Sequence, residues 1–330
     1  MRHVRRPALI IGILLFTAAA CSDGDSPSAA PETPTTATPA TIATTTLPPT
    51  TVAPKPTVTL DSPGTQPRQP MTLRLAAGSS AKVAMVNKLT LKITVGGQAA
   101  PQSVVPGTRQ VITQRVDKVE ADGSAVVSVT FSEASVVPTP GADPAVVQAT
   151  QAGLEPLNRI RGTQTIDPDG GVRSATFDTS AVSDPAIKGT LDSMTSQLGS
   201  LSAPFPREPV GVGARWTVTS TANIAGLKMT TTTRYTLRSR SGDRYELDQT
   251  QEAVAVAGPV ALPKLPAGAQ ASVTNFTVKS TGQISGDLTR HLPTKSSTKG
   301  TGDGAFSMTI GSEKVSLVQN MTMDMTTSPA

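Results

Sequence analysis

The sequence has very few residues of the types that carry metal-dependent or nucleophilic catalysis. It contains one cysteine and two histidines, and only His291 lies beyond the first twenty residues. Zinc sites use several His or Cys ligands, and nucleophilic triads need a histidine base. No glycine-rich phosphate loop precedes a helical pattern. We therefore expect a protein that is not an enzyme and binds neither a metal ion nor a dissociable cofactor.

Disulfides and aromatic residues are equally scarce. Cys21 is the only cysteine, so no disulfide can form within the chain. Aromatic residues make up 3% of the sequence, with Trp216 as the single tryptophan. The folded part must therefore be held by a core of Val, Leu, Ile, Ala and Met, and we expect Trp216 to belong to that core.

The first twenty residues have the pattern of an export signal. Met1 to Arg6 carries three arginines and no acidic residue, and Ala8 to Ala20 is uncharged and mostly apolar. This run is too short to cross a bilayer, which takes roughly 20 apolar residues. A basic start, a short apolar run and small residues at its end are typical of a secretory signal peptide.

The sequence Ala18-Ala19-Ala20-Cys21 resembles a lipobox, the cleavage site of bacterial lipoproteins, with Ala18 where leucine is usual. The resemblance implies that residues 1–20 are removed and that Cys21 carries covalent lipid. It places the protein at the outer face of the cell membrane, lipid-anchored in the cell envelope. The alternative is an ordinary signal peptide with a cysteine there by chance.

The charge of the precursor gives no sign of nucleic-acid binding. The sequence has 29 basic and 24 acidic residues, and cleavage before Cys21 would remove three arginines. The remaining 26 basic residues nearly balance the 24 acidic ones and form no cluster. Because nucleic-acid binding requires a concentrated basic face, we expect no nucleic-acid partner.

A segment rich in threonine and proline separates the signal from the folded part. Ser22 to Pro70 holds 13 threonines and 11 prolines and has no aromatic residue. Such a segment cannot bury enough apolar surface to offset its chain entropy. We therefore assign residues 21–70 to a lipid-anchored, disordered stalk and residues 71–330 to a strand-rich envelope domain. The same composition is typical of O-glycosylated stalks, although a bare spacer explains it as well.

Most of residues 71–330 alternates between apolar and polar residues with period two, as strands do. In Ala125 to Ser132, for example, Val127, Val129 and Phe131 share one face. Turn signals such as Ala121-Asp122-Gly123 and Ser241-Gly242-Asp243 separate these segments.

Two segments have a helical pattern instead. The first follows Asp143-Pro144 and runs to Gly162, and the second follows Asp184-Pro185 and ends before Pro204. In the second, Leu191, Met194 and Leu198 fall on one apolar stripe. The predicted fold is α+β and mainly β: a large curved antiparallel sheet, or half-barrel-like meander, with two amphipathic helices on its inner face. This architecture is similar to the half-barrels of lipid-carrying envelope lipoproteins.

A faint internal repeat suggests that the domain is a duplication of residues 71–205 and 206–330. A glycine precedes Ala81-Lys82-Val83 and Ala214-Arg215-Trp216 at the same spacing, and the turn at Gly123 is echoed at Gly242. A third echo relates Gly170-Gly171-Val172 to Gly282-Gln283-Ile284.

One motif resembles an actinobacterial lipoprotein family of unknown function. It is Pro209-Val210-Gly211-Val212-Gly213-Ala214-Arg215-Trp216, in a sequence that begins with a lipobox and a Thr/Pro-rich stalk. The resemblance implies location and domain type, and it supplies no activity.

Three features of the sequence are candidates for functional sites. His291 precedes Leu292-Pro293 and is expected at the surface, at a strand end. Asp167-Pro168-Asp169-Gly170-Gly171 resembles part of a calcium loop, but it lacks the further carboxylates and is better explained as a hairpin turn. Met321, Met323 and Met325 alternate along the last strand, and methionine lines surfaces that accept varied apolar ligands. The same residues fill an irregular core equally well, and core packing is the favoured explanation.

The leading hypothesis is a non-enzymatic lipoprotein that binds an apolar or lipid-like ligand between sheet and helices. Its membrane contact is the lipid on Cys21, and its candidate ligand-binding residues are Met321, Met323, Met325, Leu191, Met194 and Leu198. The first alternative is a structural domain displayed on a stalk, which binds a protein or polysaccharide through its surface. The second is a hydrolase that uses carboxylates alone.

Overall fold

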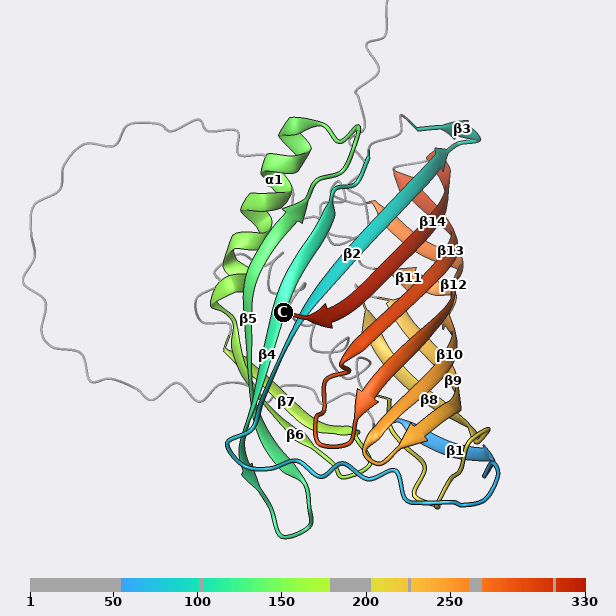
Figure 1. Cartoon of the computed structure of the whole chain (residues 1–330). Coiled ribbons are helices and arrows are strands. Elements are labelled where there is room, and N and C mark those ends of the chain that lie inside the picture. Colours follow the sequence, from blue (N-terminus) through green and yellow to red (C-terminus); the bar gives the residue numbers. More distant parts are fainter. Residues whose placement is uncertain (1–54, 101–103, 179–202, 225–226, 261–268, 311–312) are drawn as a thin grey trace, which may run out of the picture.

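A single large antiparallel sheet forms almost all of the described protein (Figure 1). The computed structural model describes residues 55–100, 104–178, 203–224, 227–260, 269–310 and 313–330. The strands of the first half are β1 (Thr57–Ser62), β2 (Ser80–Val95), β3 (Gln98–Ala99), β4 (Gly107–Val119), β5 (Ala125–Val137), β6 (Arg161–Ile166) and β7 (Val172–Asp178). Those of the second half are β8 (Arg215–Ile224), β9 (Leu227–Ser241), β10 (Arg244–Ala255), β11 (Gly258–Val260), β12 (Gln270–Asp287), β13 (Lys295–Ile310) and β14 (Glu313–Pro329). The expected mainly β fold with one large antiparallel sheet is confirmed.

The sheet consists of two meanders joined edge to edge. Its order is β1-β8-β9-β10-β12-β13-β14-β2-β4-β5-β6-β7, with β11 on β12 and β3 on β2. The join is the pairing of β14 with β2, in which Leu317 lies opposite Val95 and Pro329 opposite Val83. Gly123 and Gly242 both have positive φ in hairpin turns, as the repeat predicts, but Gly282 lies inside β12 and not at a turn. The duplication remains a prediction.

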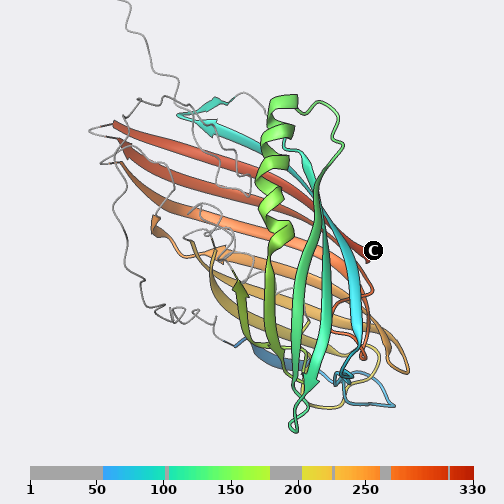
Figure 2. The same cartoon turned by 90° about the vertical axis from the view of Figure 1, so that its left-hand side faces the viewer.

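The sheet curls so that its two halves meet across the inner face. One buried cluster, which we call the basal core, contains Val127 of β5 and Ile166 of β6 together with Trp216, Leu237 and Leu247 of β8 to β10. These strands are far apart in the sheet order. Only strong curvature brings their inner faces into contact, because the natural twist of a sheet coils its ends toward each other. Figure 2 shows this curvature from the side of β5.

Glycines in β12 and β13 allow large side chains to lie flat on the inner face. A side chain at Gly304 would collide with the ring of Phe276, and one at Gly302 would collide with Met321. Glycine is otherwise unfavourable in a strand, and it occurs where another group approaches the backbone closely. The tight inner curve of the sheet therefore depends on these positions.

The folded part begins before Met71, earlier than the assignment of residues 21–70 to a stalk implies. β1 pairs with β8, and Val58 and Leu60 pack against the basal core. These two apolar residues alternate with threonines and Asp61, which is a short strand signal inside the Thr/Pro-rich region.

The Pro209–Trp216 motif has a structural role. It packs against the segment that follows β1 and is hydrogen-bonded to it. Gly211 lies against the carbonyl of Thr65, where any side chain would collide with the backbone. Val210 exchanges backbone hydrogen bonds with Gln69, with N–O distances of 3.0 Å. Trp216 is fully buried, stacks on Tyr235 and donates its indole N–H to the Pro204 carbonyl at 3.0 Å. The prediction that Trp216 belongs to the core is confirmed.

The two expected helices on the inner face need correction. In the part of the chain that the structure describes there is one α-helix, α1 (Pro144–Leu154), followed by a 3₁₀ turn, η1 (Glu155–Arg159). It begins at an Asp143 N-cap as predicted, but it ends well before Gly162, which is already in β6. The second expected helix, after Asp184, lies outside the described residues.

The helix α1 covers the edge of β5 rather than the face of the sheet (Figure 2). Beyond Thr130, β5 has no pairing with β6. The side chain of Gln151 accepts a hydrogen bond from the N–H of Val136 at 2.9 Å, and that of Asn158 accepts one from Ala134 at 2.8 Å. These amides replace the missing strand, because a buried backbone N–H must find a partner. No helix of the described residues is long and apolar enough to span a membrane.

Candidate functional site

The inner face carries a second apolar cluster. It lies at the other ends of the strands from the basal core. We call it the methionine patch. Its buried members are Leu91, Leu227, Met229, Ala255, Val260, Ala271, Val273, Phe276, Phe306, Met308, Leu317 and Met321. All of these residues lie in strands, so the sheet alone forms the patch.

Three candidate residues lie in or beside this patch. Met321 is buried in it, Met323 packs against it, and Met325 follows on the same face of β14. In β13 they lie opposite Gly302, Gly300 and Thr298. The structure therefore brings these methionines together on the inner face. Leu191, Met194 and Leu198 lie outside the described residues.

Two hollows formed by the described residues lie away from the patch. One, of about 680 Å³, is open along α1 and lined by Val147, Gln151 and neighbouring residues. The other, of about 530 Å³, is lined by Arg234, Lys279 and Lys299 among others. These three side chains alternate with inner-facing residues, so this hollow belongs to the outer face.

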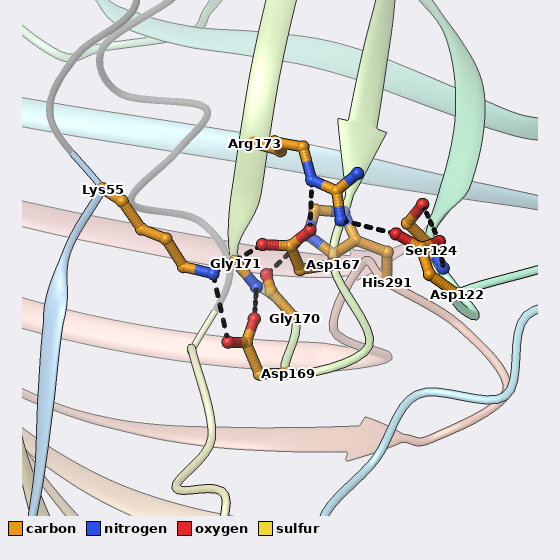
Figure 3. Close-up of polar contacts among 9 residues, drawn as sticks. All are labelled: Lys55, Asp122, Ser124, Asp167, Asp169, Gly170, Gly171, Arg173 and His291. Atoms are coloured by element: carbon orange, nitrogen blue, oxygen red, sulfur yellow. Dashed lines mark hydrogen bonds and ion pairs between the residues drawn. The ribbon is translucent and has the colours of Figure 1, made fainter. Parts of the chain in front are cut away.

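A polar cluster lies where β1 begins near the β6–β7 turn (Figure 3). Asp167, whose side chain is 8% exposed, is its centre. It accepts a hydrogen bond from Lys55 at 2.6 Å and another from Arg173 at 2.7 Å. Lys55 also pairs with Asp169 at 3.5 Å, and Arg173 with Asp122 at 2.9 Å.

The charges of this cluster stabilise one another. The hydrogen bond to Asp167 raises the pKa of Lys55. Hydrogen bonds from Ser124, and then from Arg173, hold the pKa of Asp122 well below its usual range. Each of the three carboxylates pairs with the side chain of Lys55 or of Arg173. The cluster thus ties the start of β1 to two turns of the other meander.

The Asp167–Gly171 segment is a hairpin turn, as predicted. The N–H of Asp167 donates to the Gly171 carbonyl at 2.8 Å, and Gly170 has a φ of 81°. In the described part of the chain, no three His, Cys, Asp or Glu residues come together in a way that could hold a metal ion.

His291 is not the surface residue that the sequence predicts. Its Nε2 lies 3.3 Å from the Gly170 carbonyl oxygen, and its Nδ1 lies 3.2 Å from Nε2 of Gln114. Burial lowers the pKa of His291 to about 4. Leu292 and Pro293, both buried, pull this loop inward. These two apolar residues were the sequence signal that the loop is buried.

The polar cluster has the chemistry of a structural clasp. Its carboxylates are paired with cations, and His291 is hydrogen-bonded in its neutral form. Lys55 was not singled out from the sequence, because it lies in the Thr/Pro-rich region and no local pattern announces an ion pair with a residue 112 positions away.

Comparisons with known proteins find a similarity over part of the chain. A family of unknown function (DUF6263) matches residues 190–292, which include the Pro209–Trp216 motif. No curated protein matches the chain. A solved structure from work on the asymmetric conductivity of engineered proteins is 8% identical, with 74% of this chain and 100% of that one covered and a TM-score of 0.19. LpxR from Salmonella typhimurium is 8% identical, with 74% and 99% covered and a TM-score of 0.13. TM-scores this low do not establish a shared fold.

Proposed function

We propose that the protein is a membrane-anchored envelope lipoprotein that binds an apolar or lipid-like molecule on the inner face of its curved sheet. Covalent lipid on Cys21 would hold it at the outer face of the cell membrane. The observation that carries the proposal is the methionine patch, a cluster of buried apolar side chains on the inner face with half-buried ones such as Met323 packed against it. Leu191, Met194 and Leu198 belong to the same proposal as residues that would meet this surface.

The chemistry of the patch suits an apolar ligand. Burying apolar surface contributes roughly 25 cal/mol per Å², and methionine adapts its shape to varied ligands. Met323 and Met325 are only half-buried, although they continue the line of the buried Met321. A lipid molecule that lies along β14 would complete the burial of these two side chains.

Native mass spectrometry of the full chain carrying Cys21→Ser tests the proposal. This substitution removes the covalent lipid, so that any lipid released on denaturation was bound non-covalently. We expect a discrete lipid mass on the protein purified from its native host. A protein that carries no lipid and takes up none from added dioleoylglycerol would contradict the proposal.

A matched pair of variants locates the binding face. Met323 and Thr322 are neighbours on β14 that point to opposite faces. Met323→Lys would place a charge on the inner face and should abolish lipid binding, since an unpaired charge is costly in an apolar site. Thr322→Lys, on the outer face, should retain it. Equal loss in both variants would argue against the inner face.

The alternative function is a domain displayed on a stalk that binds a polymer or protein through its outer face. The outer hollow favours it, because its lining holds Arg234, Lys279 and Lys299 against a single carboxylate. That carboxylate, Glu252, pairs with Lys279 at 3.3 Å. Such a partner would be acidic. Replacement of these three residues by glutamine would abolish binding of an acidic partner and leave lipid binding unchanged.

A further inference from the structure

A band of uncharged polar side chains crosses the inner face between the basal core and the methionine patch. We call it the polar belt. Strand pairing places Gln249, Gly282 and Thr298 in one row, and Gln251, Ser280 and Gly300 in the next. On β14, Met325 continues the first of these rows and Met323 the second. A third row, on the other side of the first, contains Ser296, Thr327 and Gln110. The belt comprises Thr233, Gln249, Gln251, Ser280, Ser296, Thr298, Thr327, Asn87 and Gln110.

The belt faces inward because its residues alternate with those of the two apolar clusters. Leu247 of the basal core precedes Gln249 by two residues on β10, and Ile284 follows Gly282 by two on β12. Residues two apart on a strand share a face. Gln110 joins the same face because it lies opposite Met85, which packs among buried apolar residues.

Most of the belt is buried, and two pairs of its side chains are hydrogen-bonded to each other. Nε2 of Gln249 donates to Oγ1 of Thr298 at 2.9 Å, and the Ser280 hydroxyl donates to Oε1 of Gln251 at 3.2 Å. Thr298 is 5% exposed and Ser280 is 6% exposed. An amide and a hydroxyl each have further donor and acceptor capacity beyond one bond.

Gln110 is the exception, because its amide nitrogen has no partner. The residue is 8% exposed, and its Nε2 is buried without a hydrogen-bond acceptor in the described structure. Leaving a buried donor unsatisfied costs about 1–3 kcal/mol. A ligand oxygen at this point would recover that free energy.

The three rows that span the belt contain no charged side chain. The Asp, Glu, Lys and Arg residues of these strands alternate onto the outer face, as Arg234, Lys279 and Lys299 do. A phosphate or carboxylate bound at the belt would be buried without a counter-ion, which is strongly unfavourable. Hydroxyl and ester oxygens, by contrast, match the amide and hydroxyl groups of the belt.

We propose that the polar belt is the head-group subsite for an uncharged amphiphile whose head carries hydroxyl or ester oxygens. The inference rests on the proposed function and names its ligand class. The row of Gln251 and Ser280 is adjacent to the row of Val278 and Met321, because two residues separate them on each strand. Two residues of a strand span about 7 Å. A head at the belt thus places its chains on the methionine patch.

The test compares two lipids with the same chains and different heads. The full chain carrying Cys21→Ser is offered 1,2-dioleoylglycerol and 1,2-dioleoylphosphatidate in competition, and the bound fractions are measured by native mass spectrometry. We expect at least a tenfold preference for dioleoylglycerol. Gln110→Leu and Thr298→Val should each reduce this preference at least fivefold, whereas Thr301→Val, on the outer face of the same strand, should leave it unchanged.

The outcomes separate the two proposals. Equal binding of both lipids, a preference for phosphatidate, or an unchanged preference in both belt variants would overturn the head-group subsite and leave lipid binding intact. Failure of both lipids to bind would overturn the proposed function and this inference with it. Gln110→Leu removes an unpartnered buried donor, so its melting temperature should not fall below that of the parent chain. Thr298→Val provides the second, independent reading.

Discussion

Single residues in this protein act through the partners that the curved sheet brings to them. His291 and Gln114 are 177 positions apart in sequence, and they meet only because the β13 side of the sheet folds over β4. Asp167 likewise gathers Lys55 and Arg173. At this scale the molecule contains a clasp, whose charges are paired, and an inner face, whose polar groups are uncharged.

The low pKa of His291 makes the stability of the protein depend on pH. The folded-state pKa is about 4, against about 6.5 in the unfolded chain. The unfolded state therefore binds a proton first as the pH falls, and stability is lost between pH 6.5 and pH 4. Because the residue retains some exposure, we expect a loss of about 2 kcal/mol from this group between pH 7.5 and pH 4.5.

Urea unfolding of the parent chain and of His291→Gln at both pH values measures this effect. Glutamine keeps a hydrogen-bonding side chain and cannot titrate. The parent chain should lose more stability than the variant by about 2 kcal/mol. An identical loss in both proteins would show that His291 is not the group responsible.

At the scale of elements, the sheet depends on how its edges are closed. The helix α1 and the following turn η1 close the upper edge of β5 with one side-chain amide each, and the clasp ties β1 to the β6–β7 turn. The unpaired backbone groups of an exposed sheet edge can pair with a strand of another molecule and so cause aggregation. These two devices therefore protect the two outer parts of the sheet.

Removal of the Gln151 amide should weaken the upper edge of β5. Gln151→Ala leaves the N–H of Val136 without its acceptor, and we expect a loss of about 1–2 kcal/mol in the free energy of unfolding. Hydrogen exchange at Val136 should become at least tenfold faster. Gln148→Ala, an exposed position on the same helix, is the control and should change neither quantity. Equal exchange rates in the two variants would contradict the role given to Gln151.

Removal of Lys55 should loosen the start of β1. Lys55→Met breaks the ion pairs with Asp167 and Asp169, and the cost should be about 1 kcal/mol because the Asp167 side chain is only 8% exposed. Limited proteolysis should then cleave near residue 55 more rapidly. Lys82→Met breaks a pair with the exposed Glu133 and should cost less than 0.5 kcal/mol. A Lys55 variant as resistant as the Lys82 variant would exclude the clasp.

The sequence predicts these elements unequally. Period-two alternation correctly indicated the strands, and Asp143-Pro144 correctly indicated the start of α1. The place of α1 could not be predicted, because the pairing of β6 stops at Thr130 for reasons of sheet geometry that no local pattern records. The strand β1 was not predicted, because its apolar residues Val58 and Leu60 lie in a segment whose threonines and prolines are typical of a disordered stalk.

The candidate site was predictable only in part. Alternation in β14 places the three methionines on one face from sequence alone. The inward direction of Gln110 follows from its pairing opposite Met85 of β2, a contact between strands that the sequence does not reveal. His291 was misplaced because its partners come from distant strands.

At the scale of the whole molecule, the curved sheet separates three kinds of surface. The basal core joins the two meanders, the methionine patch lies on the inner face beyond it, and the polar belt lies between them. Charged side chains of the central strands point to the other face. This order of surfaces along the inner face is what an amphiphile requires, with its head at the belt and its chains on the patch.

The central claim is that an apolar chain lies against the methionine patch, and methyl NMR of the full Cys21→Ser chain tests it most directly. The sequence has nine methionines, so ¹³C-methyl labelling gives few and assignable signals. On addition of dioleoylglycerol we expect the signals of Met321, Met323 and Met325 to shift, and that of Met321, which lies beyond the rows of the belt, to show contacts with the acyl chain. The signal of Met71, in the basal core, should stay unchanged. Lipid binding that leaves the three β14 methionines unperturbed would contradict the account.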